Sequence, residues 1–147
     1  MLFRSVFALV VWAIFTAISL LISDKSYGVI ALALFSFNAL AFTLASLGIS
    51  FLIGNLIKSR NSQQAIANVL ALGTCFISGV FVPQELLGPT VKTIASFTPT
   101  YWYIANVMDL SSQVITFNFT INVAIQLGFA AAAVIVALVV ARQKASV

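Results

Sequence analysis

Four long apolar runs, separated by short polar segments, constrain the fold of this chain more than any other feature. They cover residues 6–22, 29–57, 65–82 and 121–141. Each run is long enough, or nearly so, to cross the roughly 30 Å hydrocarbon layer of a bilayer as a helix. We therefore expect an all-α polytopic membrane protein in which one transmembrane domain, residues 1–147, contains four transmembrane helices.

The scarcity of charge points to the same class of protein. Charged residues make up 7% of the chain, whereas a soluble domain carries about 25%. So few charges could not cover a water-facing surface, and the expected surroundings are the lipid bilayer. The seven Lys and Arg residues are scattered rather than clustered on one face, so we expect no nucleic-acid partner.

The basic residues also predict the orientation, because Lys and Arg gather in the cytoplasmic loops of membrane proteins. With both termini in the cytoplasm, the inner side holds five basic residues, and the outer side holds two together with all three acids. The inner set is Arg4, Lys58, Arg60, Arg142 and Lys144, and the outer set is Lys25 and Lys92 with Asp24, Glu85 and Asp109. We expect a multi-pass cell-membrane protein with both termini cytoplasmic.

All three prolines lie between the third and the fourth run. Pro83 is expected to end the third span, since a helix interior tolerates neither its missing N–H nor its ring. Pro89, after Gly88, and Pro99, after Thr98, each fit the first position of a helix. The second of these helices should reach about residue 110. The segment thus predicts two short, outward-facing amphipathic helices in an extracellular cap at about residues 83–118.

Large apolar side chains distinguish this cap from an ordinary solvated loop, which would not need them. The apolar side of the cap is formed by Leu86, Leu87, Val91, Ile94 and Phe97. Tyr101 and Trp102 stand in the second short helix, and such rings favour the membrane–water boundary. We expect the cap to lie at the outer boundary of the bilayer.

The run SGVFVPQELLGPTVKTIASFTPTYWYIANV resembles the signature region of type-2 ABC-transporter permeases. The matching residues are Ser78, Gly79, Pro83, Leu86, Pro89, Ile94, Pro99, Tyr101 and Trp102. The preceding run RNSQQAIANVLAL fits the cytoplasmic turn that leads into the fifth span of that family. The resemblance is concentrated between about residues 60 and 110, and we expect a bacterial source.

This resemblance implies the membrane-spanning permease subunit of an ATP-driven exporter. Such a subunit works with cytoplasmic ABC ATPase subunits and with a second permease copy or a homologous subunit. The nucleotide is bound by the partner, so the resemblance implies no cofactor and no enzymatic chemistry in this chain. Members of the family usually have six spans, and this chain would supply spans three to six. It would then be a fragment, a split permease or a degenerate copy.

The residues themselves also argue against catalysis. The chain has no histidine, which excludes Ser-His-Asp and Cys-His arrangements, and no two carboxylates lie close in sequence. It lacks the G-x-x-x-x-G-K-[ST] phosphate loop. None of the four runs contains an ionisable acid or base, which disfavours a proton-coupled carrier. We expect no catalytic, metal-binding or cofactor-binding residues.

Small and weakly polar residues recur at helical spacing within the apolar runs. The candidates for a translocation path or a helix interface are Thr43, Ser46, Ser50, Gln64, Asn68 and Ser78. In the second run, Ser46, Ser50 and Gly54 form a series that predicts close helix contact. The fourth run repeats the pattern in Asn122, Gln126, Ala130, Ala133, Ala137 and Ala141. Helix packing alone and a substrate-facing lining are both compatible with these series.

Two other functions remain open from the sequence. The chain could be a non-transporting four-helix membrane protein, such as an assembly or immunity factor, that shares this topology. A small pore is the third alternative.

Overall fold

The computed structural model describes residues 2–22, 29–112 and 118–145, and within these ranges the chain is helical and contains no strand. The helices are α1 (Leu2–Ile22), α2 (Val29–Leu56), α3 (Arg60–Ile77), the 3-10 helix η1 (Gln84–Leu86), α4 (Pro89–Ala95), α5 (Pro99–Ser111) and α6 (Asn118–Ala145). The predicted all-α fold is therefore confirmed for the described residues. Residues 113–117 of the expected cap lie outside them.

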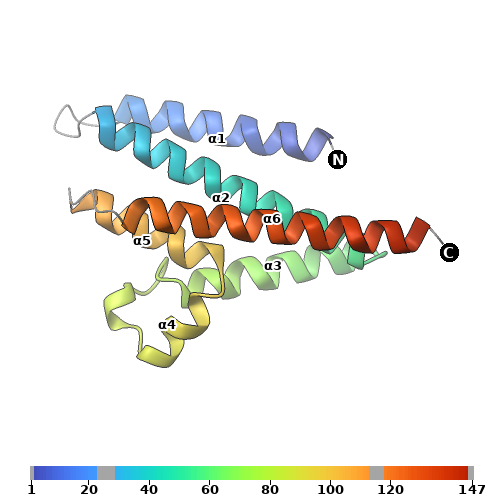
Figure 1. Cartoon of the computed structure of the whole chain (residues 1–147). Helices are drawn as coiled ribbons and strands as arrows, with labels where there is room; N and C mark the ends of the chain where they lie inside the picture. Colours follow the sequence, from blue (N-terminus) through green and yellow to red (C-terminus); the bar gives the residue numbers. More distant parts are fainter. Residues whose placement is uncertain (1, 23–28, 113–117, 146–147) are drawn as a thin grey trace.

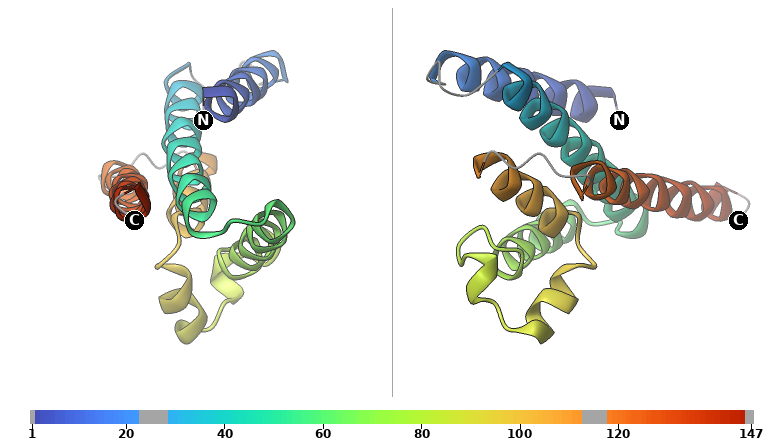
Figure 2. Two further views of the ribbon diagram at one scale, coloured as in Figure 1. Left: turned by 90° about the vertical axis from the view of Figure 1, so that its right-hand side faces the viewer. Right: turned by 60° about the vertical axis from the view of Figure 1, so that its left-hand side comes forward.

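Helix α2 occupies the centre of the arrangement (Figures 1 and 2). Its most extensive contact is with α6, and it also packs against α1 and α5. Seen along the molecule, α1 and α6 lie on different sides of α2, and α3 lies below them beside α4 (Figure 2, left). Helix α1 begins, α6 ends and α2 turns into α3 at the same end of the molecule (Figure 1).

Small side chains allow α2 and α6 to approach closely. Ala41, Ala45 and Gly48 are buried on α2, and a Cβ atom on Gly48 would come within 2.9 Å of the Ala130 carbonyl oxygen. The predicted α6 stripe supplies the facing surface, in which Ala133 and Ala137 are buried. The series predicted for α2 lies elsewhere: Ser50 is exposed and Ser46 is half-buried. Small residues thus recur on two faces of α2, and the face that meets α6 is the one with Ala41, Ala45 and Gly48.

Helix α3 ends six residues before Pro83, at Ile77, so the expectation that Pro83 terminates this helix is wrong. Gly79 has a φ of +100°, and the Val80 N–H donates to the Cys75 carbonyl over 3.3 Å. This is a Schellman motif, in which a residue in the left-handed region closes the last helical turn. Glycine adopts that conformation without strain, so Gly79 was the signal in the sequence for the end of the helix.

The two short helices of the cap begin where the prolines predict. Pro89 and Pro99 are the first residues of α4 and α5, with Gly88 and Thr98 as their N-caps. Proline fits there because its φ is already helical and the first turn lacks an acceptor for an N–H. Pro83 instead precedes η1 as its N-cap.

By length and composition, two helices of the described chain are suited to cross a membrane, Val29–Leu56 and Asn118–Lys144. Helix α1 carries a shorter apolar segment, Ser5–Leu21. Helix α3 starts with five polar residues, 60–64, and has no buried residue. The expected four-span topology is thus supported directly for α2 and α6.

Basic residues gather at the end of the molecule where α1 begins and α6 ends. Lys58 and Arg60 lie at the connection of α2 to α3, and Arg142 and Lys144 lie in the last turn of α6. The Lys144 ammonium donates to the Asn55 carbonyl and joins the ends of α6 and α2. Of the other charges used to predict the orientation, Asp24 and Lys25 are outside the described residues.

Gly48→Ala should destabilise the protein, whereas Gly128→Ala should not. The new methyl group at Gly48 would meet backbone and force α2 away from α6, while a Cβ at Gly128 would meet open space. Overpacking of this kind costs about 1–3 kcal/mol, and alanine otherwise favours a helix by roughly 0.5–1 kcal/mol over glycine. Unfolding by a denaturing detergent would measure both variants. Equal unfolding midpoints would show that α2 and α6 do not approach closely at Gly48.

Candidate functional site

Four amide side chains form a buried cluster where α2, α5 and α6 meet. They are Asn38, Asn106, Asn122 and Gln126, each 6% exposed or less. The Asn122 amide donates to the Asn106 Oδ1 over 2.8 Å. The amides of Asn106 and Gln126 both donate to the Asn38 Oδ1, each over 2.9 Å. Asn38 in turn donates to the Tyr103 carbonyl over 3.1 Å, so the cluster joins all three helices.

The amide cluster joins three helices and lies apart from the cavities described below. Its members line none of the cavities described below. Among the described residues, the one buried side-chain polar atom without a partner is the Gln126 Oε1. The sequence placed Asn122 and Gln126 in a helical series compatible with helix packing or with a substrate-facing lining. It missed Asn38 and Asn106, although an asparagine such as Asn38, inside a long apolar run, was a signal in itself.

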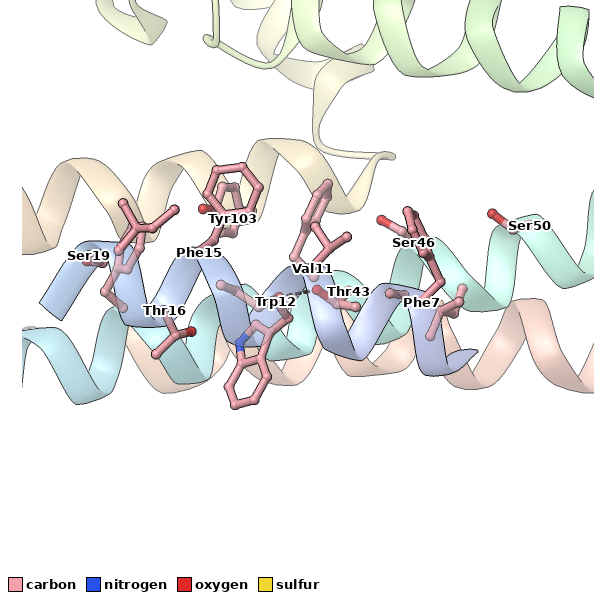
Figure 3. Close-up of a pocket in the computed structure, with 16 residues that line it drawn as sticks. Phe7, Val11, Trp12, Phe15, Thr16, Ser19, Thr43, Ser46, Ser50 and Tyr103 are labelled. Atoms are coloured by element: carbon pink, nitrogen blue, oxygen red, sulfur yellow. Dashed lines mark hydrogen bonds between the residues drawn. The ribbon is translucent and has the colours of Figure 1, made fainter. Parts of the chain in front are cut away.

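A groove of about 660 Å³ lies between α1 and α2 and reaches α5 (Figure 3). Its walls are mostly apolar and aromatic, with Phe7, Phe15, Phe35, Phe42 and Tyr103 among them, and hydroxyl groups come from Thr16, Ser19, Thr43, Ser46 and Ser50. The Phe42 and Tyr103 rings stack with centroids 4.8 Å apart. Ligand sites in proteins commonly have this volume and this mixture of apolar walls with few polar groups.

The hydroxyls of the groove fall into two groups. One group ties helices together or is bound locally: Thr16 pairs with the Ser36 hydroxyl over 3.2 Å, and Thr43 donates to the Ala39 carbonyl over 2.8 Å. The other group is open: the hydroxyls of Ser19 on α1 and of Ser46 and Ser50 on α2 make no hydrogen bond with any described residue. These three are therefore free to contact a ligand or another helix.

Two further cavities adjoin the same face of α2. One, of about 500 Å³, lies between α2, α3 and α5 and shares Ser46 and Ser50 with the groove. The other, of about 600 Å³, lies at the connection of α2 to α3 and includes Gln64 and Arg60 together with Ser50. Ser50 borders all three spaces, and Ser46 borders two of them.

The structure brings together four of the six candidate path residues. Thr43, Ser46, Ser50 and Gln64 line these connected cavities. Asn68 is exposed on α3 and lines none of them. Ser78 is fully buried at the end of α3, where its hydroxyl pairs with that of Thr98 over 3.1 Å.

Gln84, which the sequence did not single out, also holds the cap to the end of α3. The Gln84 amide donates to the carbonyls of Ser78 over 2.8 Å and Tyr101 over 3.2 Å. Its side chain lies where a Cβ atom of Gly79 would be. The Trp102 indole donates to the Ser96 carbonyl over 2.8 Å and links α5 to the end of α4.

Much of the predicted apolar side of the cap faces away from the protein. Leu86, Ile94 and Phe97 are exposed, while Ala95 is the buried residue of α4. This outward apolar surface suits contact with the membrane boundary.

Within the described ranges, no three His, Cys, Asp or Glu residues gather as a metal site would require. The cavities present hydroxyl, amide and aromatic side chains to a ligand.

Comparisons with known proteins identify similar sequences. Residues 1–111, which include all helices up to the end of α5, match the protein family described as ABC-2 type transporter. The Linearmycin resistance permease protein LnrN of Bacillus subtilis (strain 168) is 26% identical over 69 residues. That alignment covers 47% of this chain and 18% of the relative, so the chain matches a minor part of the relative's length. No solved structure gives a significant match.

Asn38→Leu should destabilise the protein strongly, although the two side chains are similar in volume. The amides of Asn106 and Gln126 would lose their shared acceptor inside the protein, and a buried unpaired polar group costs about 1–3 kcal/mol. Asn68→Leu is the matched control, because Asn68 is exposed on α3. Detergent unfolding should separate the two variants clearly. Similar stabilities would mean that the amide cluster does not hold the helices together.

Proposed function

The chain belongs to the ABC-2 type transporter family, and from this premise we propose that it is the membrane-spanning permease part of an ATP-driven exporter. The family match over residues 1–111 is the observation that carries the proposal. In this proposal the chain supplies part of the translocation path and performs no chemistry. ATP is bound and hydrolysed by a separate cytoplasmic ABC ATPase.

The proposed partners follow from the part of a permease that the chain matches. The named relative is a resistance permease, and the alignment covers 18% of it. We propose that α1, α2, α3 and α6 act as spans within a larger permease unit. That unit pairs with a second copy or a homologous subunit and with two ATPase subunits.

The proposed orientation places the basic end of the molecule in the cytoplasm. Lys58, Arg60, Arg142 and Lys144 lie at that end, and the positive-inside rule assigns such an end to the cytoplasmic face. The cap, with Glu85 and the exposed apolar side chains of α4, then faces outward. The protein is accordingly a multi-pass component of the cell membrane with both termini cytoplasmic.

The proposed path runs along the face of α2 that carries Thr43, Ser46 and Ser50. Two of these hydroxyls have no partner among the described residues, and the cavities beside them extend to Gln64 near the cytoplasmic end. Asn68, exposed on α3, is proposed to contact a neighbouring span or subunit. Ser78 is proposed to hold the cap in place rather than to contact substrate.

Transport by the full permease that contains this chain should require its ATPase and depend on Ser46. In proteoliposomes with the ATPase, Ser46→Leu should lower the ATP-driven transport rate roughly tenfold, if its bulk raises the barrier by about 1.4 kcal/mol. Ala131→Leu adds the same bulk to an exposed position on α6 and should leave the rate unchanged. Co-purification of the ATPase should persist in both variants. Transport driven by a pH gradient without ATP would refute the exporter proposal.

The orientation can be tested with single cysteines in a Cys75→Ala background. Thr93 on α4 and Ser62 on α3 are both exposed. Thr93→Cys should react with an impermeant thiol reagent added to intact cells, and Ser62→Cys should react only after the membrane is opened. The reverse pattern would invert the orientation. Reaction of both from outside would show that α3 does not cross the membrane.

A further inference from the structure

Two of the cavities join at the basic end of the molecule. The α1–α2 groove and the cavity at the α2–α3 connection share Phe7, Leu47 and Ser50. The cavity at the connection, here called the polar chamber, is lined on its α3 side by Arg60, Asn61, Gln63, Gln64 and Ala67. A polar chamber therefore adjoins the mouth of an apolar groove.

The groove has the length of a hydrocarbon chain in one leaflet. On α1 its lining runs from Phe7 to Ser19, which is about 18 Å at 1.5 Å per residue. One leaflet contributes about half of the roughly 30 Å hydrocarbon layer. No charged side chain lines the groove. An extended acyl chain matches both its length and its lack of charge.

The polar chamber is suited to an anion. Arg60 is the charged residue of its lining, which contains no acid. Asn61 and Gln64 are exposed amides that can donate further hydrogen bonds, whereas the Gln63 amide is already bound to the Ile57 carbonyl over 2.6 Å. Ser59, the N-cap of α3, makes no side-chain capping bond, so the first-turn N–H groups add positive potential here.

We propose that the groove and the polar chamber together bind one anionic phospholipid of the cytoplasmic leaflet. The phosphate lies at Arg60, Asn61 and Gln64, and one acyl chain lies in the groove between α1 and α2. Basic pockets between spans on the cytoplasmic side are known to recognise such head groups. The assignment to this leaflet rests on the orientation proposed above, but binding itself requires neither ATP nor transport.

Quenching of Trp12, which lines the groove, tests the proposal directly. The chain has two tryptophans, so Trp102→Phe leaves Trp12 as the reporter. Purified protein in phosphatidylcholine nanodiscs would receive brominated-chain phosphatidylglycerol or brominated-chain phosphatidylcholine in increasing amounts. We expect phosphatidylglycerol to quench at a several-fold lower mole fraction. Arg60→Gln should weaken its binding roughly fivefold, and Lys58→Gln, which removes a charge outside the lining, should not.

A second pair of variants tests the position of the acyl chain. Ala39→Leu adds bulk inside the groove and should reduce quenching, whereas Ala131→Leu on the exposed side of α6 should not. Native mass spectrometry of the unsubstituted protein should retain one phosphatidylglycerol and no phosphatidylcholine.

Several outcomes would overturn the proposal. Equal quenching by the two lipids would mean non-selective annular lipid only. An equal loss in Lys58→Gln and Arg60→Gln would mean general attraction to a basic surface. Unchanged quenching in Ala39→Leu would place the acyl chain outside the groove. None of these results bears on ATP-driven transport, so the lipid site and the exporter proposal can fail separately.

Discussion

The burial of four uncharged amides is the constraint on which this structure depends. A polar group removed from water must find a partner or lose several kcal/mol, and a bilayer offers no water to replace one. The Asn38 Oδ1 is such a partner: it accepts hydrogen bonds from the amides of Asn106 on α5 and Gln126 on α6. Any rotation or sliding of α2 against α5 or α6 would break these bonds. The three helices therefore behave as one unit.

The remaining helices, α1 and α3, pack outside the amide cluster, and the cavities lie beside them. Helix α1 contacts α2 through the Trp12 indole, which donates to the Ser36 carbonyl, and through the pairing of Thr16 with the Ser36 hydroxyl. Helix α3 has no buried residue. The space beside Ser46 and Ser50 is thus bounded by this unit on one side and by α1 and α3 on the other. In the proposed transport function, α1 and α3 are the walls of this space that the amide cluster does not fix.

The sequence predicted the features that depend on local chemistry and missed those that depend on partners. Pro89 and Pro99 marked two helix starts because their ring fixes φ whatever surrounds them. Gly79 carried a local signal too, yet Pro83 was preferred as the end of α3. The α6 stripe was recognised, but which face of α2 would meet it was not, since Gly48 and Ser50 are both small residues. Asn38 could be noticed alone, whereas its pairing with Asn106 requires the fold.

In the cap, local sequence decides where the helices begin, and tertiary contacts decide where they lie. The prolines begin α4 and α5, but they do not decide where those helices lie. Gln84 positions α5 against α3, because its amide reaches Ser78 at the end of α3 and Tyr101 in α5, across a space that only glycine at position 79 leaves open. The end of α4 is linked to α5 by the Trp102 indole. From Tyr101, α5 continues to Tyr103 and Asn106, which contact Phe42 and Asn38 on α2. A displacement at the end of α3 must therefore either break the Gln84 bonds or move α5 against the amide cluster.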